Sequence, residues 1–136
     1  MIIDSSALIA ILRKEPEALR LVTAIGKSSV RWFPASCFLE ASMLILGRGS
    51  ADALRDLDLL IARYHIEIMD FSESQARLAR EAFKRYGKGR HPAKLNFGDC
   101  MAYALAKETG EELLFKGASC KIPQNCIRLG RTVDFT

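Results

Sequence analysis

Apolar and polar positions along the chain follow each other in a way that predicts short strands separated by helices. Apolar runs of three or four residues, bounded by polar residues or glycine, are typical of buried strands. Longer segments in which apolar residues recur every three or four positions are typical of helices that bury one face. The strands expected on this basis cover residues 1–3, 30–33, 66–69 and 113–115. The expected helices cover residues 7–13, 16–26, 34–46, 50–64, 72–86 and 96–108.

Residues at the predicted helix ends agree with these boundaries. Ser5 and Ser6 can cap the first helix, because short polar side chains accept hydrogen bonds from the free N–H groups of a first turn. Ser50, Ser72 and Asn96 stand in the same position before the fourth, fifth and sixth helices. Pro16 fits the first turn of the second helix and Pro34 opens the third, so each predicted helix has a local signal for where it begins.

Strands that alternate with helices imply parallel strand pairs joined by helical crossovers. We therefore expect an α/β fold, a three-layer α/β/α sandwich whose central, mainly parallel sheet carries helices on both faces. The chain has 136 residues, enough for one domain with one core, and no repeat or linker divides it. A single domain over residues 1–136 is expected, and residues 127–129 are a candidate for one further edge strand.

The composition excludes several classes of protein. Hydrophobic residues make up 49% and charged residues 26% of the chain, a balance typical of globular rather than disordered proteins. No apolar run has membrane-spanning length and no signal peptide is visible, so we expect a cytoplasmic protein without membrane association. Cys37 and Cys100 lie in apolar helical patterns, and Cys120 and Cys126 are expected to be reduced thiols. Without a CxxC pair, a zinc site is not expected.

The positive charge of the chain is concentrated in one segment. The formal net charge is +4, and residues 82–98 contribute five basic residues and no acid, which leaves the rest at +4 − 5 = −1. Such a local excess suits a polyanionic partner such as nucleic acid, although an ordinary solvated loop would look the same. The basic residues are Lys84, Arg85, Lys88, Arg90 and Lys94.

Three acidic residues interrupt apolar sequence. Asp4 follows the first strand directly, and ligands of parallel sheets bind outside the carboxyl ends of strands. Glu40 and Asp99 lie in helices that are apolar nearly all round and are therefore expected to be buried. Buried carboxylates are costly unless another group compensates their charge. A divalent cation would compensate all three, and oxygen-only ligands favour Mg²⁺ or Mn²⁺ over zinc.

Each acid also has a simpler explanation. Asp4 could only cap the first helix, Glu40 could pair with a distant arginine, and Asp99 could interact with the dipole of its helix. Ser6 could contact water at a bound cation and Asn96 could hold Asp99 or Glu40, yet both could equally be helix caps. Without a metal site, the three acids need three separate explanations. One shared metal site explains all three, so the joint pattern favours such a site.

Several segments resemble VapC toxins of the PIN-domain superfamily, in order and at the family's spacing from Met1 to about Gly117. They are IIDSSAL at 2–8, LEAS at 39–42, NFGDCMAYALA at 96–106 and LLFKG at 113–117. The resemblance implies a parallel sheet with helices on both sides and Mg²⁺- or Mn²⁺-dependent cleavage of RNA, commonly tRNA or rRNA. It also implies a homodimer that a VapB-type antitoxin inhibits. It places Asp4, Glu40 and Asp99 at the metal-binding acid positions, with Ser6 and Asn96 beside them.

One part of the chain departs from that family. The family usually has a further acid just after the Lys-Gly, whereas Gly117 here is followed by Ala118-Ser119-Cys120. Ser119 is at best a neutral ligand, so the cation should be held more weakly. Residues 121–136 also differ from the family's usual ending. An alternative is therefore a weakened or inactive PIN module that still binds its antitoxin or RNA.

Two other functions are less consistent with the sequence. A phosphatase with an aspartate nucleophile at Asp4 usually needs a second acid two residues later, and position 6 is serine. A nucleic-acid-binding protein without catalysis would explain the basic segment, which would hold an RNA backbone electrostatically. It would leave Glu40 unexplained.

Overall fold

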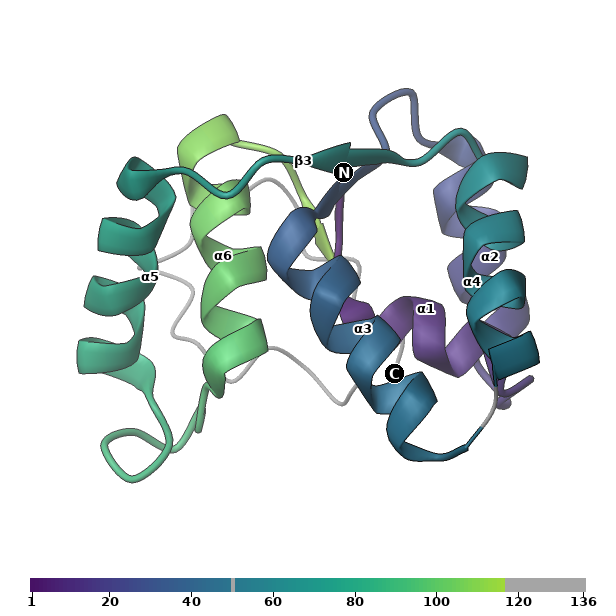
Figure 1. The fold of residues 1–136 in the computed structure, drawn as a ribbon. Coiled ribbons are helices and arrows are strands. Elements are labelled where there is room, and N and C mark those ends of the chain that lie inside the picture. Colours follow the sequence, from purple (N-terminus) through teal and green to yellow (C-terminus); the bar gives the residue numbers. More distant parts are fainter. Residues whose placement is uncertain (50, 117–136) are drawn as a thin grey trace.

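The computed structural model describes residues 1–49 and 51–116, and strands and helices alternate along them as the apolar pattern predicts (Figure 1). The strands are β1 (Ile2–Ile3), β2 (Trp32–Pro34), β3 (Glu67–Met69) and β4 (Leu113–Leu114). The helices are α1 (Ser5–Leu12), α2 (Ala18–Lys27), α3 (Ala35–Gly47), α4 (Ala51–Arg63), α5 (Glu73–Tyr86) and α6 (Phe97–Thr109). The expected strand at residues 127–129 lies outside the described residues.

The four strands form one parallel sheet in the order β3-β2-β1-β4. β1 lies in the interior of this sheet, where Ile2 is in register with Trp32 of β2 on one side and with Leu113 of β4 on the other. Helices flank the sheet: Figure 1 shows α5 and α6 together at one side of the molecule, and α1, α2 and α4 together at the opposite side. The expected α/β architecture with a central parallel sheet is confirmed.

β1 sits at the centre of the core because both of its side chains are apolar. Ile2 and Ile3 are fully buried, as are Phe33 of β2 and Leu114 of β4. Burial on both faces is the usual state of a parallel strand, whose neighbours are covered by crossover helices. The chain leaves β1 at Asp4, so this acid is fixed at the carboxyl edge of the sheet.

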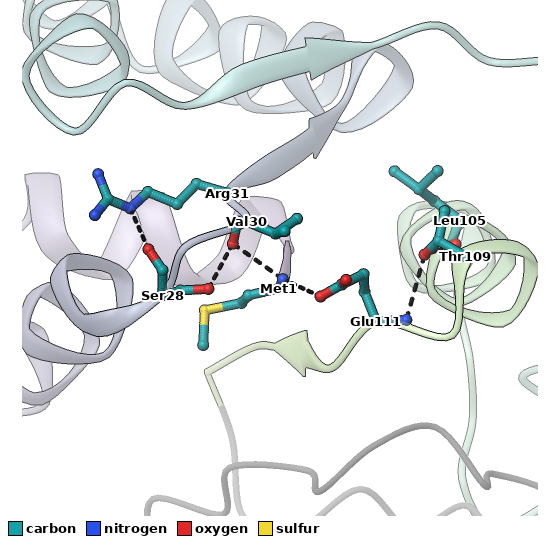
Figure 2. A network of polar contacts seen from close by, with 7 residues as sticks. All are labelled: Met1, Ser28, Val30, Arg31, Leu105, Thr109 and Glu111. Atoms are coloured by element: carbon teal, nitrogen blue, oxygen red, sulfur yellow. Dashed lines mark hydrogen bonds and ion pairs between the residues drawn. The ribbon is translucent and has the colours of Figure 1, made fainter.

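A network of polar contacts anchors the other end of β1 (Figure 2). The Met1 ammonium donates to the Val30 carbonyl at 3.0 Å and to the Glu111 carboxylate at 2.6 Å. Ser28 Oγ donates to the same Val30 carbonyl, and the Glu111 N–H lies 3.4 Å from Thr109 Oγ1. The segments that precede β2 and β4 are thus tied to the start of β1.

The helices differ in how much of their surface is buried. α6 is buried all round from Cys100 to Ala106, as its sequence predicts. The same expectation for α3 is wrong, because Leu39 is 59% exposed and Met43 is 64% exposed. Only one stripe of α3 is buried (Cys37, Ala41 and Ile45), and it packs against α1, α4 and α6. Apolar composition alone cannot bury a helix whose outer face has no neighbour among residues 1–49 and 51–116.

The first helix cap differs from the expected one. Asp4 is the N-cap of α1, and Ser5 and Ser6 are the first two helical residues. Ser72 and Asn96 cap α5 and α6 as expected, and Ser50 lies outside the described residues. The order Asp-Ser-Ser contains three good caps in a row, and the end of β1 decides which of them is used.

The cysteines and the helix lengths complete the description. Cys37 and Cys100 are buried free thiols, as expected, and Cys120 and Cys126 lie outside the described residues. Among residues 1–49 and 51–116, no helix is both long and apolar enough to cross a membrane.

Candidate functional site

Asp4 occupies the junction between β1 and α1 and is only 5% exposed. Its Oδ2 accepts a hydrogen bond from the backbone N–H of Ser6 at 3.0 Å, which caps α1. Its Oδ1 is buried and has no hydrogen-bond partner among the described residues. Capping and ligand binding therefore do not compete here, because they use different oxygens of one carboxylate.

Glu40 reaches toward Asp4 from α3. It is half-buried rather than buried, which corrects the sequence expectation, because it borders the exposed side of α3. Its Oε2 accepts a hydrogen bond from Ser5 Oγ at 2.6 Å. Ser5 follows Asp4 directly, so Glu40 is bound to the residue next to the buried acid.

Asp99 stands in the first turn of α6 and is also half-buried rather than buried. It forms a capping box with Asn96: the Asp99 N–H donates to Asn96 Oδ1, and the Asn96 N–H donates to Asp99 Oδ2, each at 2.9 Å. Asn96 thus has both roles that its sequence position allowed. It caps α6, and in doing so it orients the Asp99 carboxylate.

The electrostatics indicate that the three acids lie near one another. The pKa of Asp4 is raised to about 6, chiefly by burial and to a smaller extent by the charges of Asp99 and Glu40, while the hydrogen bonds from Ser6 act in the opposite direction. Burial also raises the pKa of Asp99. The pKa of the Cys37 thiol is raised by burial and then by the neighbouring Asp4 and Glu40. In the described part of the chain, none of the three acids is ion-paired with a basic side chain.

A divalent cation fits the donor chemistry of this region. The available ligands are carboxylate oxygens, the type that Mg²⁺ and Mn²⁺ prefer, and the buried Oδ1 of Asp4 has no hydrogen-bond partner within the described residues. In residues 1–49 and 51–116, however, no three His, Cys, Asp or Glu side chains lie close enough together to form a closed metal cluster. The acids surround one region, and their carboxylates are turned toward Ser6, Ser5 and Asn96. Ser119, the fourth candidate ligand, lies outside the described residues.

Ser6 has a structural partner. Its Oγ accepts a hydrogen bond from the backbone N–H of Lys116 at 3.0 Å, which joins α1 to the segment that follows β4. The Lys116 ammonium in turn contacts Glu15 and lies 3.9 Å from Glu17. This contact holds the chain after β4 against the start of α1, next to Asp4.

The basic segment is an ordered loop with exposed charges. The N–H of Lys88 donates to the Leu95 carbonyl and that of Leu95 to the Tyr86 carbonyl, each at 2.9 Å, which closes the base of the loop. The Tyr86 ring also packs edge-to-face on His91, with ring centroids 5.2 Å apart. All five basic side chains are exposed, two in the last turn of α5 and three in the loop: Lys84, Arg85, Lys88, Arg90 and Lys94.

Three residues next to the acids were not identified from the sequence. Ser5 binds Glu40, Gly98 lies against the Glu40 carboxylate, and Cys37 Sγ lies 3.9 Å from the Gly98 carbonyl oxygen. The only signal for them was their position inside the motifs that carry Asp4, Glu40 and Asp99. Their partners are far away in sequence, so their roles become visible only in the folded chain.

Comparison with known proteins gives a consistent result. The model of the PIN domain family matches residues 1–119. A ribonuclease VapC of Mycolicibacterium smegmatis is 44% identical over 122 residues, which cover 90% of this chain and 95% of that protein. Ribonuclease VapC30 of Mycobacterium tuberculosis is 43% identical over 117 residues, 86% of this chain and 89% of that protein.

The fold also matches a solved structure. The crystal structure of Mycobacterium tuberculosis VapC20, described as a toxin that cleaves the sarcin–ricin loop, superposes with a TM-score of 0.68. The match covers 85% of this chain and 88% of that one, at 16% sequence identity. At that identity the match supports the fold alone.

Proposed function

The chain belongs to the PIN-domain family, and from that premise we propose that it is an endoribonuclease of the VapC type, the toxin of a type II toxin–antitoxin pair. Relatives that are 43–44% identical over most of the chain are named ribonucleases. The observation that carries the proposal is the buried Asp4 carboxylate at the end of β1, which is near enough to Glu40 of α3 and Asp99 of α6 for their charges to raise its pKa. We also propose that residues 1–136 form a single PIN domain.

PIN-domain VapC ribonucleases are generally dependent on divalent metal ions. We propose that the ion here is Mg²⁺ or Mn²⁺ and that Asp4, Glu40 and Asp99 bind it. When bound, such an ion supplies Lewis-acid stabilisation of the negative charge that develops on a scissile phosphate. The protein's own part is positional: the Ser6 N–H orients Asp4, Ser5 orients Glu40 and Asn96 orients Asp99.

The partners follow from the same relatives. VapC toxins act on RNA and are paired with VapB-type antitoxins, and we propose a tRNA or an rRNA as the substrate. Five exposed cations between Lys84 and Lys94 support an RNA surface, because contacts to phosphates position a substrate without reading its sequence. Exposed apolar side chains on α3 support a protein–protein surface, and we propose that the chain forms a homodimer.

The first experiment is a cleavage assay on antitoxin-free protein with total tRNA and rRNA, in Mn²⁺, in Mg²⁺ and in EDTA. We expect discrete fragments that require the metal ion and are lost in Asp99→Asn. An asparagine at 99 can still accept the hydrogen bond from the Asn96 N–H, so the capping box and the melting temperature should be nearly unchanged.

Two results would contradict the proposal. Full activity in Asp99→Asn would remove Asp99 from the site. The absence of fragments in all three conditions, from folded wild-type protein, would favour the weakened or inactive PIN module. Direct binding of Mn²⁺ at millimolar concentration would then show whether the acids still hold a cation.

A further inference from the structure

The Glu40 carboxylate lies against α6 at a place where only glycine leaves room for it. A Cβ atom built on Gly98 would lie 2.6 Å from Glu40 Cδ and closer still to both carboxylate oxygens. Real Cβ atoms essentially never approach another heavy atom within 3.0 Å. Any other residue at position 98 would therefore require the Glu40 side chain or one of the two helices to move.

The backbone does not explain this glycine. Gly98 is the second residue of α6, and its φ is not positive, so every other L residue could adopt its conformation. Glycine is also a poor helix former, because it loses more conformational freedom on folding than any other residue. Glycine at position 98 is instead explained by the Glu40 carboxylate, which lies close to the α6 backbone there.

A second contact to the same carboxylate comes from Ser5, the first residue of α1. The hydroxyl of Ser5, itself only 6% exposed, donates to Glu40 Oε2 at 2.6 Å. Hydrogen bonds to a carboxylate are stronger and shorter than those between neutral groups, so this contact strongly restricts the rotamer of Glu40. Oε1 accepts no hydrogen bond from the described residues and remains available.

Cys37 provides a further contact between α3 and α6. It lies one turn before Glu40 on α3 and is fully buried, and its Sγ lies 3.9 Å from the Gly98 carbonyl oxygen. α3 and α6 are thus in contact at Gly98 through two side chains of α3 that lie one turn apart. The position of the Glu40 carboxylate is determined by Ser5 on one side and by the bare backbone of Gly98 on the other.

We propose that Gly98 and Ser5 are positioning residues that together fix the Glu40 carboxylate for cation binding. The proposal rests on the proposed function, in which Glu40 is a ligand. Outer contacts of this kind usually matter about 10- to 100-fold for metal affinity or activity, although they never touch the metal ion. Gly98→Ala and Ser5→Ala should therefore each weaken Mn²⁺ binding by at least about 10-fold.

The first test asks whether the Gly98–Glu40 contact exists, and it needs no metal ion. Melting temperatures in EDTA are measured for wild type, Gly98→Ala, Glu40→Ala and the double variant. Gly98→Ala should lower the melting temperature in the wild-type background. In the Glu40→Ala background it should be neutral or stabilising, because the clash is gone and alanine is the better helix former. Equal effects of Gly98→Ala in both backgrounds would overturn the proposal.

The second test asks whether the contact positions a ligand. Mn²⁺ dissociation constants are measured by calorimetry for wild type, Gly98→Ala, Ser5→Ala, Ser5→Thr and Glu40→Gln. We expect weaker binding in all variants except Ser5→Thr, which keeps the hydroxyl. Gly26→Ala is the matched control, since this glycine also lies in a helix without a positive φ but has no atom within 4 Å of the added Cβ. It should bind Mn²⁺ as wild type does.

The outcomes separate this proposal from the proposed function. Weaker binding in Glu40→Gln together with unchanged binding in Gly98→Ala and Ser5→Ala would overturn the positioning role and leave Glu40 as a ligand. Unchanged binding in Glu40→Gln would overturn both the ligand assignment and the positioning role. If Gly98→Ala does not fold, Ser5→Ala against Ser5→Thr decides: only a loss that the threonine restores supports the proposal.

Discussion

At the scale of single residues, Asp4 has two oxygens in different surroundings. Oδ2 accepts a hydrogen bond from the Ser6 backbone N–H, whereas Oδ1 is buried and has no hydrogen-bond partner in the part of the chain that the structure describes. Burial raises the pKa of Asp4 from 3.8 to about 6, so the charged form is disfavoured in the folded protein. A helix cap uses only one accepting oxygen, so the capping role alone does not explain why Oδ1 is buried. Asp4 thus lowers stability in a way that a bound cation would offset.

The stability cost can be measured with Asp4→Asn in EDTA. Because the folded pKa lies above the unfolded pKa, folding binds a proton between pH 4 and 6, and the charge destabilises the protein as pH rises through that range. At pH 8 the shift corresponds to a cost on the order of 3 kcal/mol. Asparagine removes the charge but can still accept from the Ser6 N–H.

We therefore expect Asp4→Asn to resist urea more than wild type at pH 8 and to match it near pH 4. Asp58→Asn, at an exposed position of α4, serves as the control and should change little at either pH. A difference between Asp4→Asn and wild type that does not vary with pH would contradict the charge-burial explanation.

At the scale of elements, the end of α5 and the loop after it present a basic surface on an ordered backbone. The Lys88–Leu95 and Leu95–Tyr86 backbone hydrogen bonds close the base of the loop, so the backbone that carries its three cations has a defined path. Lys94 even has a left-handed backbone, with φ 52°. Exposed cations can neutralise phosphates and release their counterions, so this surface suits an RNA backbone.

We expect the triple variant Lys88→Gln, Arg90→Gln and Lys94→Asn to bind RNA more weakly than wild type. Asparagine is chosen at 94 because it tolerates a positive φ. The slope of log affinity against log salt should become shallower by about 2, since each phosphate contact on a single strand contributes about 0.7.

The control neutralises three exposed arginines on α2 and α4, which Figure 1 places at the other side of the molecule from α5: Arg20, Arg55 and Arg63. Filter binding across a salt series measures both variants. An unchanged slope in the loop variant, or an equal change in the control, would make the loop an ordinary solvated surface.

At the scale of the whole molecule, α3 presents an apolar stripe that nothing in the described chain covers. Leu39, Met43 and Leu46 recur at helical spacing and are 59%, 64% and 52% exposed. The opposite stripe of the same helix, with Cys37, Ala41 and Ile45, is buried in the core. A helix that is apolar on both sides is typical of an element that serves a core and an interface at once.

We expect the wild-type protein to be a dimer and Leu39→Lys/Met43→Lys to be a monomer of similar stability. Two charges at the centre of an apolar interface would have to be desolvated on association. Size-exclusion chromatography with light scattering gives the mass directly. Leu59→Lys on α4, at a side chain that is 56% exposed, is the control and should remain dimeric. A monomeric wild type, or a dimer that survives the double change, would refute the interface.

The sequence by itself determined the features that depend on neighbours along the chain. Alternating apolar runs and helical periods predicted β1 to β4 and the parallel sheet, because a strand or helix is encoded over a few successive residues. The two residues of the capping box, Asn96 and Asp99, are only three positions apart. The three acids were recognisable because each interrupts an apolar segment.

Only the tertiary structure decided how those acids are held. Ser5 and Glu40 are 35 positions apart, and Cys37 and Gly98 are 61 positions apart, so no local pattern could reveal that they meet. The exposed side of α3 was equally hidden, because burial depends on which helices pack nearby and not on the composition of the helix itself. Local sequence specifies elements, whereas the position of a carboxylate depends on contacts between elements that fold together from distant parts of the chain.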